Sequence, residues 1–301
     1  MLRLATRRNA VALRRAHTVA ALVQAQAPEL DVQLLDLNTE ADRALEAGSA
    51  SIVGKGPCAR EIQQALLARR ADLAVHALKD LPLESDPRLT LVAVPNRGDP
   101  RDALCATQGW TVSTLPEGAR VGTGSARRAS QLLRLRPDLS LVPTRGTLER
   151  RLQALGTGLD AVVVAYAELL SMGLAARATQ VFTWEEMLPA CGQGTIAVEA
   201  RLDDPRTLEL CSRINDLDAH ICAMAERTLI KRLGAEPRAP VGVLAQVQGE
   251  VLTLRALVST PDGAEALRSE RSGPAALFGK TATAVADDLL RQGAAPWVRA
   301  R

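Results

Sequence analysis

The sequence predicts an α/β protein with two open-sheet domains followed by a smaller α+β domain. The length of 301 residues corresponds to two or three domains at about 100–200 residues each. Short apolar stretches alternate with stretches of helical periodicity, and this alternation occurs twice in succession, which is typical of α/β units. After Cys191 the chain changes to a long helical stretch and a hairpin, which indicates a domain of another design.

The first block of alternating elements extends to about residue 95. The clearest helix in it covers residues 10–26, because apolar side chains recur there at helical spacing and Pro28 lies just past its end. Short apolar or alternating runs predict the strands. In order, we expect strand 2–6, helix 10–26, strand 31–37, helix 60–70, and strands 71–78 and 89–94. The turn-forming segment 96–100 then marks a boundary.

The second block repeats this pattern, and a different tail follows it. We expect strand 119–122, helix 125–135, strand 139–143, helix 147–155 and strand 160–165. The glycine-rich segment 188–194 predicts a crossover into the first sheet, where 195–200 adds a strand. The tail comprises helical residues 205–233, a hairpin of 241–247 and 251–258, and helix 281–292. The expected domains are 1–95 with 195–213, then 100–190, then 217–301.

The composition excludes several kinds of protein. The 47% of apolar and 24% of charged residues are ordinary for a globular domain, and no apolar run is long enough to cross a membrane. The five cysteines are widely spaced and form no CxxC pair. We therefore expect no disulfide framework, no zinc site and no other metal site. We therefore expect a reduced, cytoplasmic setting. The basic residues are 33 arginines and four lysines; this bias reflects either a GC-rich genome or a need for forked binding of anions.

Candidate site residues follow the strands, because ligands of open α/β sheets bind beyond the carboxyl ends of the strands. Lys79 and Asp80 follow an apolar strand, where they suit a site that handles an anion and a proton; a solvated strand end is the alternative. The segment 122–128 offers glycines and a helix N-terminus to an anion. Arg127 and Arg128 oppose the helix dipole there, which indicates either an anionic ligand or a partner carboxylate inside the protein.

Residues 120–151 form a basic segment with eight arginines and two acidic residues. Some of these arginines are expected on solvated helix faces, whereas Arg145 and Arg151 lie close to a strand end or a helix start. The segment contains no aromatic residue, although single-stranded nucleic acids usually bind to aromatic stacking platforms. A small polycarboxylate or phosphorylated ligand is therefore favoured, and no nucleic acid or membrane partner is expected.

The ordered set of motifs resembles the porphobilinogen deaminase (hydroxymethylbilane synthase) family. The resemblance covers most of the chain, and the ordered set is far more specific than any single motif. The matching segments are residues 6–7 with 12–13, 54–56, 70–76, 79–82, 99–103, 121–123, 127–128, 136–139, 145–146, 188–190, 192–194, 199, 201–204, 225–227 and 254–258.

The resemblance implies two domains similar to a periplasmic binding protein with a cleft between them, plus a third domain. It implies an enzyme that joins four porphobilinogens into linear hydroxymethylbilane, with release of ammonia, on a dipyrromethane cofactor held by a cysteine thioether. We expect a monomer. Asp80 would be the catalytic carboxylate. The cofactor would contact Lys79, Asp80, Thr123, Ser125, Arg127 and Arg128; substrate carboxylates would contact Arg7, Arg145, Arg151 and Gln193; and Lys55 and Arg60 would belong to a mobile loop.

One departure from the family pattern bears directly on the cofactor. The attachment cysteine would fall at Pro237, and no cysteine lies within ten residues of it, so a thioether cannot form there. Ala77 and Gly124 also stand where the family usually has serine. Three hypotheses remain. The first is a transferase of this type, working with a noncovalent or differently attached pyrrole primer. The second is a non-catalytic paralog that binds a pyrrole or another polycarboxylate, and the third is a related condensation without covalent dipyrromethane.

Overall fold

The computed structural model describes residues 1–46 and 58–299, which form two compact units. The first unit comprises Met1–Gly98 and Thr195–His220, and the second comprises Asp99–Gly194 and Ile221–Arg301. The first unit contains one five-stranded sheet. The second contains a five-stranded and a three-stranded sheet, each with its own buried cluster of apolar side chains. The α/β class with two open sheets and a small third sheet is confirmed, whereas our division into three domains stays a prediction.

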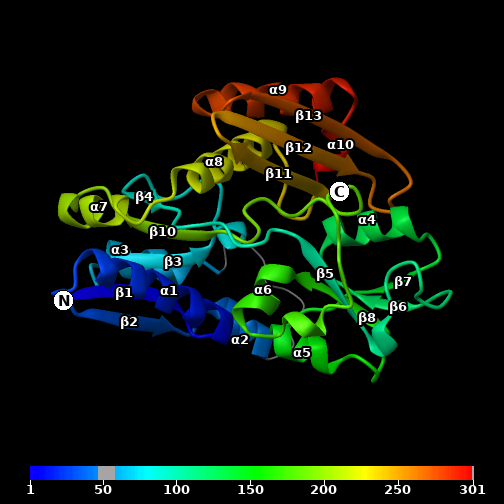
Figure 1. The fold of residues 1–301 in the computed structure, drawn as a ribbon, viewed down its shortest axis with the longest axis horizontal. Helices are drawn as coiled ribbons and strands as arrows, with labels where there is room; N and C mark the ends of the chain where they lie inside the picture. Colours follow the sequence, from blue (N-terminus) through cyan, green and yellow to red (C-terminus); the bar gives the residue numbers. More distant parts are fainter. Residues whose placement is uncertain (47–57, 300–301) are drawn as a thin grey trace. The chain divides into compact units, whose positions relative to one another are not determined.

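The sheet of the first unit has the strand order β2-β1-β3-β10-β4 (Figure 1). Its strands are β1 (Leu2–Arg7), β2 (Val32–Leu37), β3 (Leu73–Ala77), β4 (Leu89–Ala93) and β10 (Ile196–Arg201). The first three are parallel, and β10 is antiparallel to both of its neighbours. The predicted return of the chain into the first sheet is therefore confirmed.

Helices cover both faces of this sheet. On one face, α1 (Ala10–Gln26) and α7 (Pro205–Ser212) pack on apolar side chains of the strands; on the other face lies α3 (Arg60–Leu67). The side chain of Asn9 caps α1 by accepting a hydrogen bond from the backbone N–H of Ala12. The short α2 (Glu40–Glu46) follows β2 and was not predicted.

The five-stranded sheet of the second unit repeats the same design in the order β7-β6-β8-β5-β9. Its strands are β5 (Asp102–Ala106), β6 (Arg120–Gly122), β7 (Ser140–Val142), β8 (Ala161–Ala165) and β9 (Gln180–Val181). Strands β7, β6 and β8 are parallel, and β5 is antiparallel to β8 and β9. The expectation of parallel units is thus correct for three strands in each sheet. The antiparallel strand β5 of the second five-stranded sheet was not predicted.

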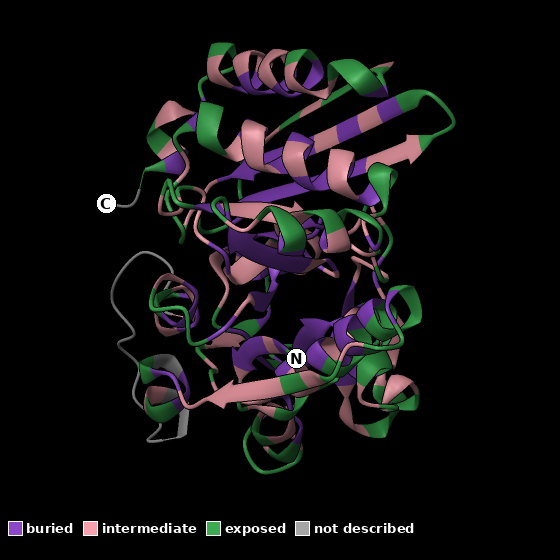
Figure 2. Ribbon diagram, turned by 90° about the vertical axis from the view of Figure 1, so that its left-hand side faces the viewer, coloured by how far each residue is buried: buried purple, intermediate pink, exposed green. Residues whose placement is uncertain are grey.

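The helices of this sheet again lie on both faces. α4 (Ala126–Leu135) packs on one face, and α5 (Leu148–Gln153) and α6 (Tyr166–Ser171) pack on the other. Ser125 caps α4 and Thr147 caps α5, each by accepting a hydrogen bond from a backbone N–H three residues on. Buried residues concentrate in inner strands such as β3 and β8, whereas the edge strands β2 and β7 contain none (Figure 2).

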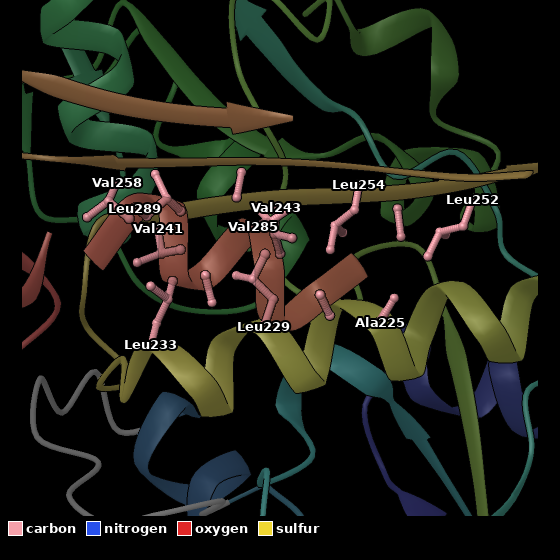
Figure 3. Close-up of a cluster of buried hydrophobic side chains, with 14 of the residues drawn as sticks. Ala225, Leu229, Leu233, Val241, Val243, Leu252, Leu254, Val258, Val285 and Leu289 are labelled. Atoms are coloured by element: carbon pink, nitrogen blue, oxygen red, sulfur yellow. The ribbon is translucent and has the colours of Figure 1, made fainter. Parts of the chain in front are cut away.

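The small sheet of the second unit has the order β11-β12-β13. Its strands are β11 (Val241–Gln248), β12 (Val251–Ser259) and β13 (Ala266–Pro274), and β11 and β12 form the predicted hairpin. α9 (Phe278–Arg291), α10 (Ala295–Val298) and the part of α8 (Leu217–Leu233) from Ile221 onward cover one face. Figure 3 shows leucine and valine side chains of α8, α9 and the strands packed into this core. The expected helix over 205–233 is broken into α7 and α8 because Asn215 and Asp216 bond the backbone at positions 94 and 219.

Candidate functional site

Arg7 and Asp80 meet at the carboxyl edge of the first sheet. Arg7 ends β1, and Asp80 lies in the short 3-10 turn η1 (Leu78–Asp80), directly after the parallel strand β3. Nη1 of Arg7 lies 3.8 Å from Oδ2 of Asp80, and the Asp80 side chain is 37% exposed. The predicted catalytic carboxylate is therefore accessible and has a cation beside it.

Asp42 holds the guanidinium of Arg7 in place. Nε of Arg7 donates to both carboxylate oxygens of Asp42 at 3.1 and 3.2 Å, and Nη2 donates to Oδ1 at 2.5 Å. Asp42 also accepts hydrogen bonds from Thr39 Oγ1 at 2.7 Å and Asn9 Nδ2 at 3.2 Å. Burial alone would raise the pKa of Asp42, but the bonds from Arg7 and Thr39 outweigh it and lower that pKa. Arg7 is thus fixed with Nη1 toward Asp80.

Sequence reasoning missed Asp42, although a signal was present. Thr39 and Asp42 are three residues apart and exchange backbone and side-chain hydrogen bonds at the start of α2, which is a capping box. The Thr-x-x-Asp spacing could have indicated this helix start.

A pocket in the first unit adjoins these residues. Its lining comprises Arg7, Ala12, Arg15, Cys58, Val75, His76, Ala77 and Asp80. Burial, and then the nearby Asp80 carboxylate, raise the pKa of Cys58 to about 12, so the thiol is protonated at neutral pH. Neither Arg15 nor Cys58 was predicted as a pocket residue.

His76 connects the pocket to a buried polar network. Its Nε2 lies 3.1 Å from Oε2 of Glu199, and both side chains are almost fully buried. Gln63 donates to both oxygens of Glu199 at 3.1 and 2.9 Å. Burial would raise the pKa of Glu199, but the contacts with His76 and Gln63 lower it. His76 therefore contacts the Glu199 side chain of β10 close to the end of β3, after which the turn with Asp80 begins.

Two other predicted residues of this unit, Lys79 and Arg60, do not line the pocket. Lys79 is half-buried beside Asp80. Arg60 is at the start of α3, where Nη1 lies 3.7 Å from Oε2 of Glu40, with both side chains at least half exposed. Lys55 lies outside the described residues.

The second five-stranded sheet gathers its candidate residues at the corresponding edge. Thr123 follows β6, Arg145 follows β7, and Asp102 begins the antiparallel strand β5 at that same edge. Oγ1 of Thr123 accepts a hydrogen bond from the N–H of Ser125 at 3.2 Å. A Cβ on Gly124 would lie 2.9 Å from the carbonyl oxygen of Thr144. Glycine at this position therefore lets the two loops approach closely.

Arg127 and Arg128 both bind the buried carboxylate of Asp102. Nη1 of Arg127 donates to Oδ2 at 2.6 Å, and Nε of Arg128 donates to Oδ1 at 2.9 Å. Nη1 of Arg127 also donates to the carbonyl of Leu188 at 2.7 Å. Burial would raise the pKa of Asp102, but the two arginines lower it. The sequence left two partners open for these arginines, an anionic ligand or a carboxylate inside the protein. The structure shows the second, the carboxylate of Asp102.

Gln193 is part of this buried network. Its Nε2 donates to Oδ1 of Asp102 at 3.0 Å and to the carbonyl of Pro100 at 2.8 Å, and Oε1 accepts from Nη2 of Arg127 at 3.4 Å. The side chain is 1% exposed. Gln193 therefore holds the crossover segment onto β5.

Arg151 and Arg145 differ in their surroundings. Nη2 of Arg151 donates to Oε2 of Glu168 at 3.3 Å, and its buried Nε has no hydrogen-bond partner among the described residues. Burial lowers the pKa of Arg151, and Glu168 opposes this shift. Arg145 is exposed.

Pro237 occupies an exposed turn after α8. The N–H of Ala239 donates to the carbonyl of Glu236 at 2.9 Å, which closes a turn with proline at its second position. Gly234, with φ of 63°, ends α8 just before this turn. The backbone is regular here, so proline suits the turn but supplies no nucleophile.

Comparison with known proteins decides the family. A family model described as the porphobilinogen deaminase, dipyromethane cofactor binding domain matches residues 2–209, and the C-terminal domain model of the same family matches residues 220–288. The chain belongs to the porphobilinogen deaminase family. A porphobilinogen deaminase of Sorangium cellulosum is 43% identical over 271 residues, which cover 90% of each chain.

Several solved structures match much of this chain at low identity and TM-scores below 0.5. A methionine-bound nutrient binding protein from Burkholderia cenocepacia covers 71% of this chain and 91% of its own, at 14% identity and a TM-score of 0.44. The VFT2 domain of BvgS from Bordetella pertussis covers 71% of this chain and 85% of its own, at 16% identity and a TM-score of 0.41. No helix in the described part of the deaminase-family chain is both long and apolar enough to cross a membrane.

Proposed function

We propose that the chain is a hydroxymethylbilane synthase, a transferase that condenses four porphobilinogen units into a linear tetrapyrrole and releases one ammonia per unit. The observation that carries this proposal is the accessible Asp80 carboxylate beside the fixed guanidinium of Arg7. The family match over both models and the 43% identity to a porphobilinogen deaminase support the same transferase class.

Asp80 has the position and charge that the condensation needs. Loss of ammonia from porphobilinogen leaves positive charge on the pyrrole, and a carboxylate next to the ring stabilises that charge. The same carboxylate accepts a hydrogen bond from the pyrrole N–H and takes part in proton transfer. Arg7 supplies a guanidinium for a carboxylate substituent of the ring.

The second sheet supports the binding of further carboxylates. We assign Arg145 and Arg151 to this task, since Arg145 is exposed and Nε of Arg151 has no hydrogen-bond partner among the described residues. Arg127, Arg128 and Gln193 form a buried frame around Asp102 that orients the loop carrying Thr123 and Ser125. In this proposal, Arg127 and Arg128 also add positive charge to the carboxyl edge of the second five-stranded sheet.

A dipyrromethane cofactor cannot be attached to this chain by a thioether at position 237. The matching domain model is named for binding it, and the arginines suit its carboxylates. Pro237 offers no sulfur for a thioether, and its turn is closed by a backbone hydrogen bond. We therefore propose that any pyrrole primer is bound without a covalent bond at Pro237.

Turnover of porphobilinogen tests the proposed function. The purified chain should release ammonia and form a product with the absorbance of a linear tetrapyrrole. Asp80→Asn should lower kcat by at least about a hundredfold, because it removes the charge next to the ring while leaving the shape of the side chain unchanged. Absence of turnover by the unaltered chain, with porphobilinogen still bound, would contradict the enzymatic function.

A further inference from the structure

Arg15 lies on α1 and lines the same pocket as Arg7 and Asp80. The two arginines differ in what holds them. Arg7 directs Nε and Nη2 to Asp42. The structure records no hydrogen bond or ion pair between the guanidinium of Arg15 and any residue that it describes, and the side chain is half-buried. A guanidinium carries five N–H donors, so the donors of Arg15 are available to a ligand.

We propose that Arg15 binds a carboxylate of the pyrrole substrate in this pocket and is therefore a substrate-binding residue in addition to Arg7. This inference rests on the proposed function, since porphobilinogen supplies the carboxylate. The planar fork of a guanidinium matches a carboxylate in two parallel hydrogen bonds. Arg7 has used two of its three nitrogens on Asp42, so Arg15 is better placed to form such a paired contact.

The charges around the pocket favour a ligand with both acidic and N–H groups. Arg7 and Arg15 attract an anion, while the Asp80 carboxylate attracts a cation or an N–H donor. Porphobilinogen carries two carboxylates, a pyrrole N–H and an aminomethyl group, which match both kinds of charge. A fully anionic ligand such as inorganic phosphate would place like charge next to Asp80.

Arg14 provides a matched control. It precedes Arg15 on the same helix and is exposed, but it does not line the pocket. Exchanging either residue for glutamine removes the same charge and has the same effect on helix propensity. A difference in KM between the two variants is therefore due to the position of Arg15 in the pocket.

The test compares the steady-state kinetics of Arg15→Gln, Arg14→Gln and the unaltered chain with porphobilinogen. Arg15→Gln should raise KM about tenfold and change kcat less than about twofold, because a carboxylate away from the reacting carbon is bound equally in the ground and transition states. Arg14→Gln should change neither value. Arg15→Lys, which keeps the charge but loses the fork, should raise KM by an intermediate factor, and it serves as the test if the glutamine variant does not fold.

The proposal is overturned if KM of Arg15→Gln stays within twofold of the unaltered chain, or if both glutamine variants shift it equally. Should the unaltered chain release no ammonia, the proposed function fails separately, and calorimetric titration with porphobilinogen then decides the inference. An affinity loss of about tenfold in Arg15→Gln alone supports it. Equal affinities, or no binding to the unaltered chain, overturn it.

Discussion

At the residue scale, Asp42 determines where the guanidinium of Arg7 can lie. Hydrogen-bond donors of three residues, Arg7, Thr39 and Asn9, converge on its carboxylate, and α2 begins at the same place. Asp42 is not among the residues that line the pocket. In the proposed function, it would therefore influence substrate binding through the position of Arg7.

Asp42→Asn should weaken this arrangement. The amide cannot pair with the guanidinium by charge, so we expect kcat/KM to fall about tenfold and the unfolding free energy to fall by about 1–3 kcal/mol. Asp36→Asn is the matched control, since Asp36 pairs with the well-exposed Arg8, and it should change both quantities little. Equal losses in the two variants would contradict this role for Asp42. Steady-state kinetics and urea unfolding measure both effects.

The Asp42 pair also has a defined pH dependence. Because the folded pKa of Asp42 is lowered, its stabilisation is complete above the unfolded pKa of about 3.9 and is lost as the pH falls through the folded value. The difference in unfolding free energy between the unaltered chain and Asp42→Asn should therefore be constant from about pH 8 to 5 and shrink below about pH 4.

At the scale of elements, the two five-stranded sheets share one plan. In each sheet two of the three parallel strands carry candidate residues at their carboxyl ends, β1 and β3 or β6 and β7, and one antiparallel strand, β10 or β5, fills the fourth position. In the second sheet this strand starts with Asp102, whose carboxylate ties α4 to the sheet through Arg127 and Arg128. The start of α4 is therefore positioned by an ion pair in the core.

Arg127→Ala should destabilise the second unit. Removing one partner of a buried ion pair leaves charge that is incompletely compensated, and the cost is about 3–5 kcal/mol. Arg134→Ala, on an exposed position of the same helix, should change the unfolding free energy by less than about 0.5 kcal/mol. Loss of Arg127 also raises the pKa of Asp102, so acid unfolding should begin at a higher pH than in the unaltered chain. Thermal unfolding between pH 7 and 3 measures both effects. Equal losses of stability in Arg127→Ala and Arg134→Ala would contradict this role of Arg127.

At the scale of the whole molecule, the chain combines Asp80 with a proline at the position where the family resemblance implies the attachment cysteine. The small sheet and the second five-stranded sheet lie in one unit, joined by contacts such as the hydrogen bond between Ser130 and Ser259 at 2.8 Å. The turn with Pro237 lies at the exposed surface of that unit. Position 237 therefore offers no thiol for a covalent bond to a pyrrole.

Intact mass measures this difference directly. After incubation with porphobilinogen, the unaltered chain should keep the mass of the bare polypeptide. Pro237→Cys should gain mass in steps of pyrrole units, because a thiol in an exposed turn can add to the electrophilic carbon left by ammonia, forming a C–S bond and releasing the thiol proton. Pro237→Ser should gain none. Stable added mass on the unaltered chain would show that another residue holds the primer.

Much of the fold was predictable because it depends on local patterns. Helix 10–26 matches α1 at both ends, and the hairpin matches β11 and β12, since apolar periodicity and turn residues determine such elements. Strand β13 was missed because its middle residues, 268–272, are all polar or charged, as is common at a sheet edge. Strand β5 was missed because its five residues include an aspartate and two alanines.

The sequence by itself determined the α/β class, the family and the candidate residues at the strand ends, because these depend on periodicity and on the order of motifs. Only the tertiary structure decided how those residues are used. Asp42 lies 35 positions from Arg7, and Asp102 lies about 25 from the two arginines it binds, so neither pairing has a local signal. Burial made these pairs necessary, because a guanidinium inside a protein requires a counter-charge, and chain folding determined which carboxylate supplied it.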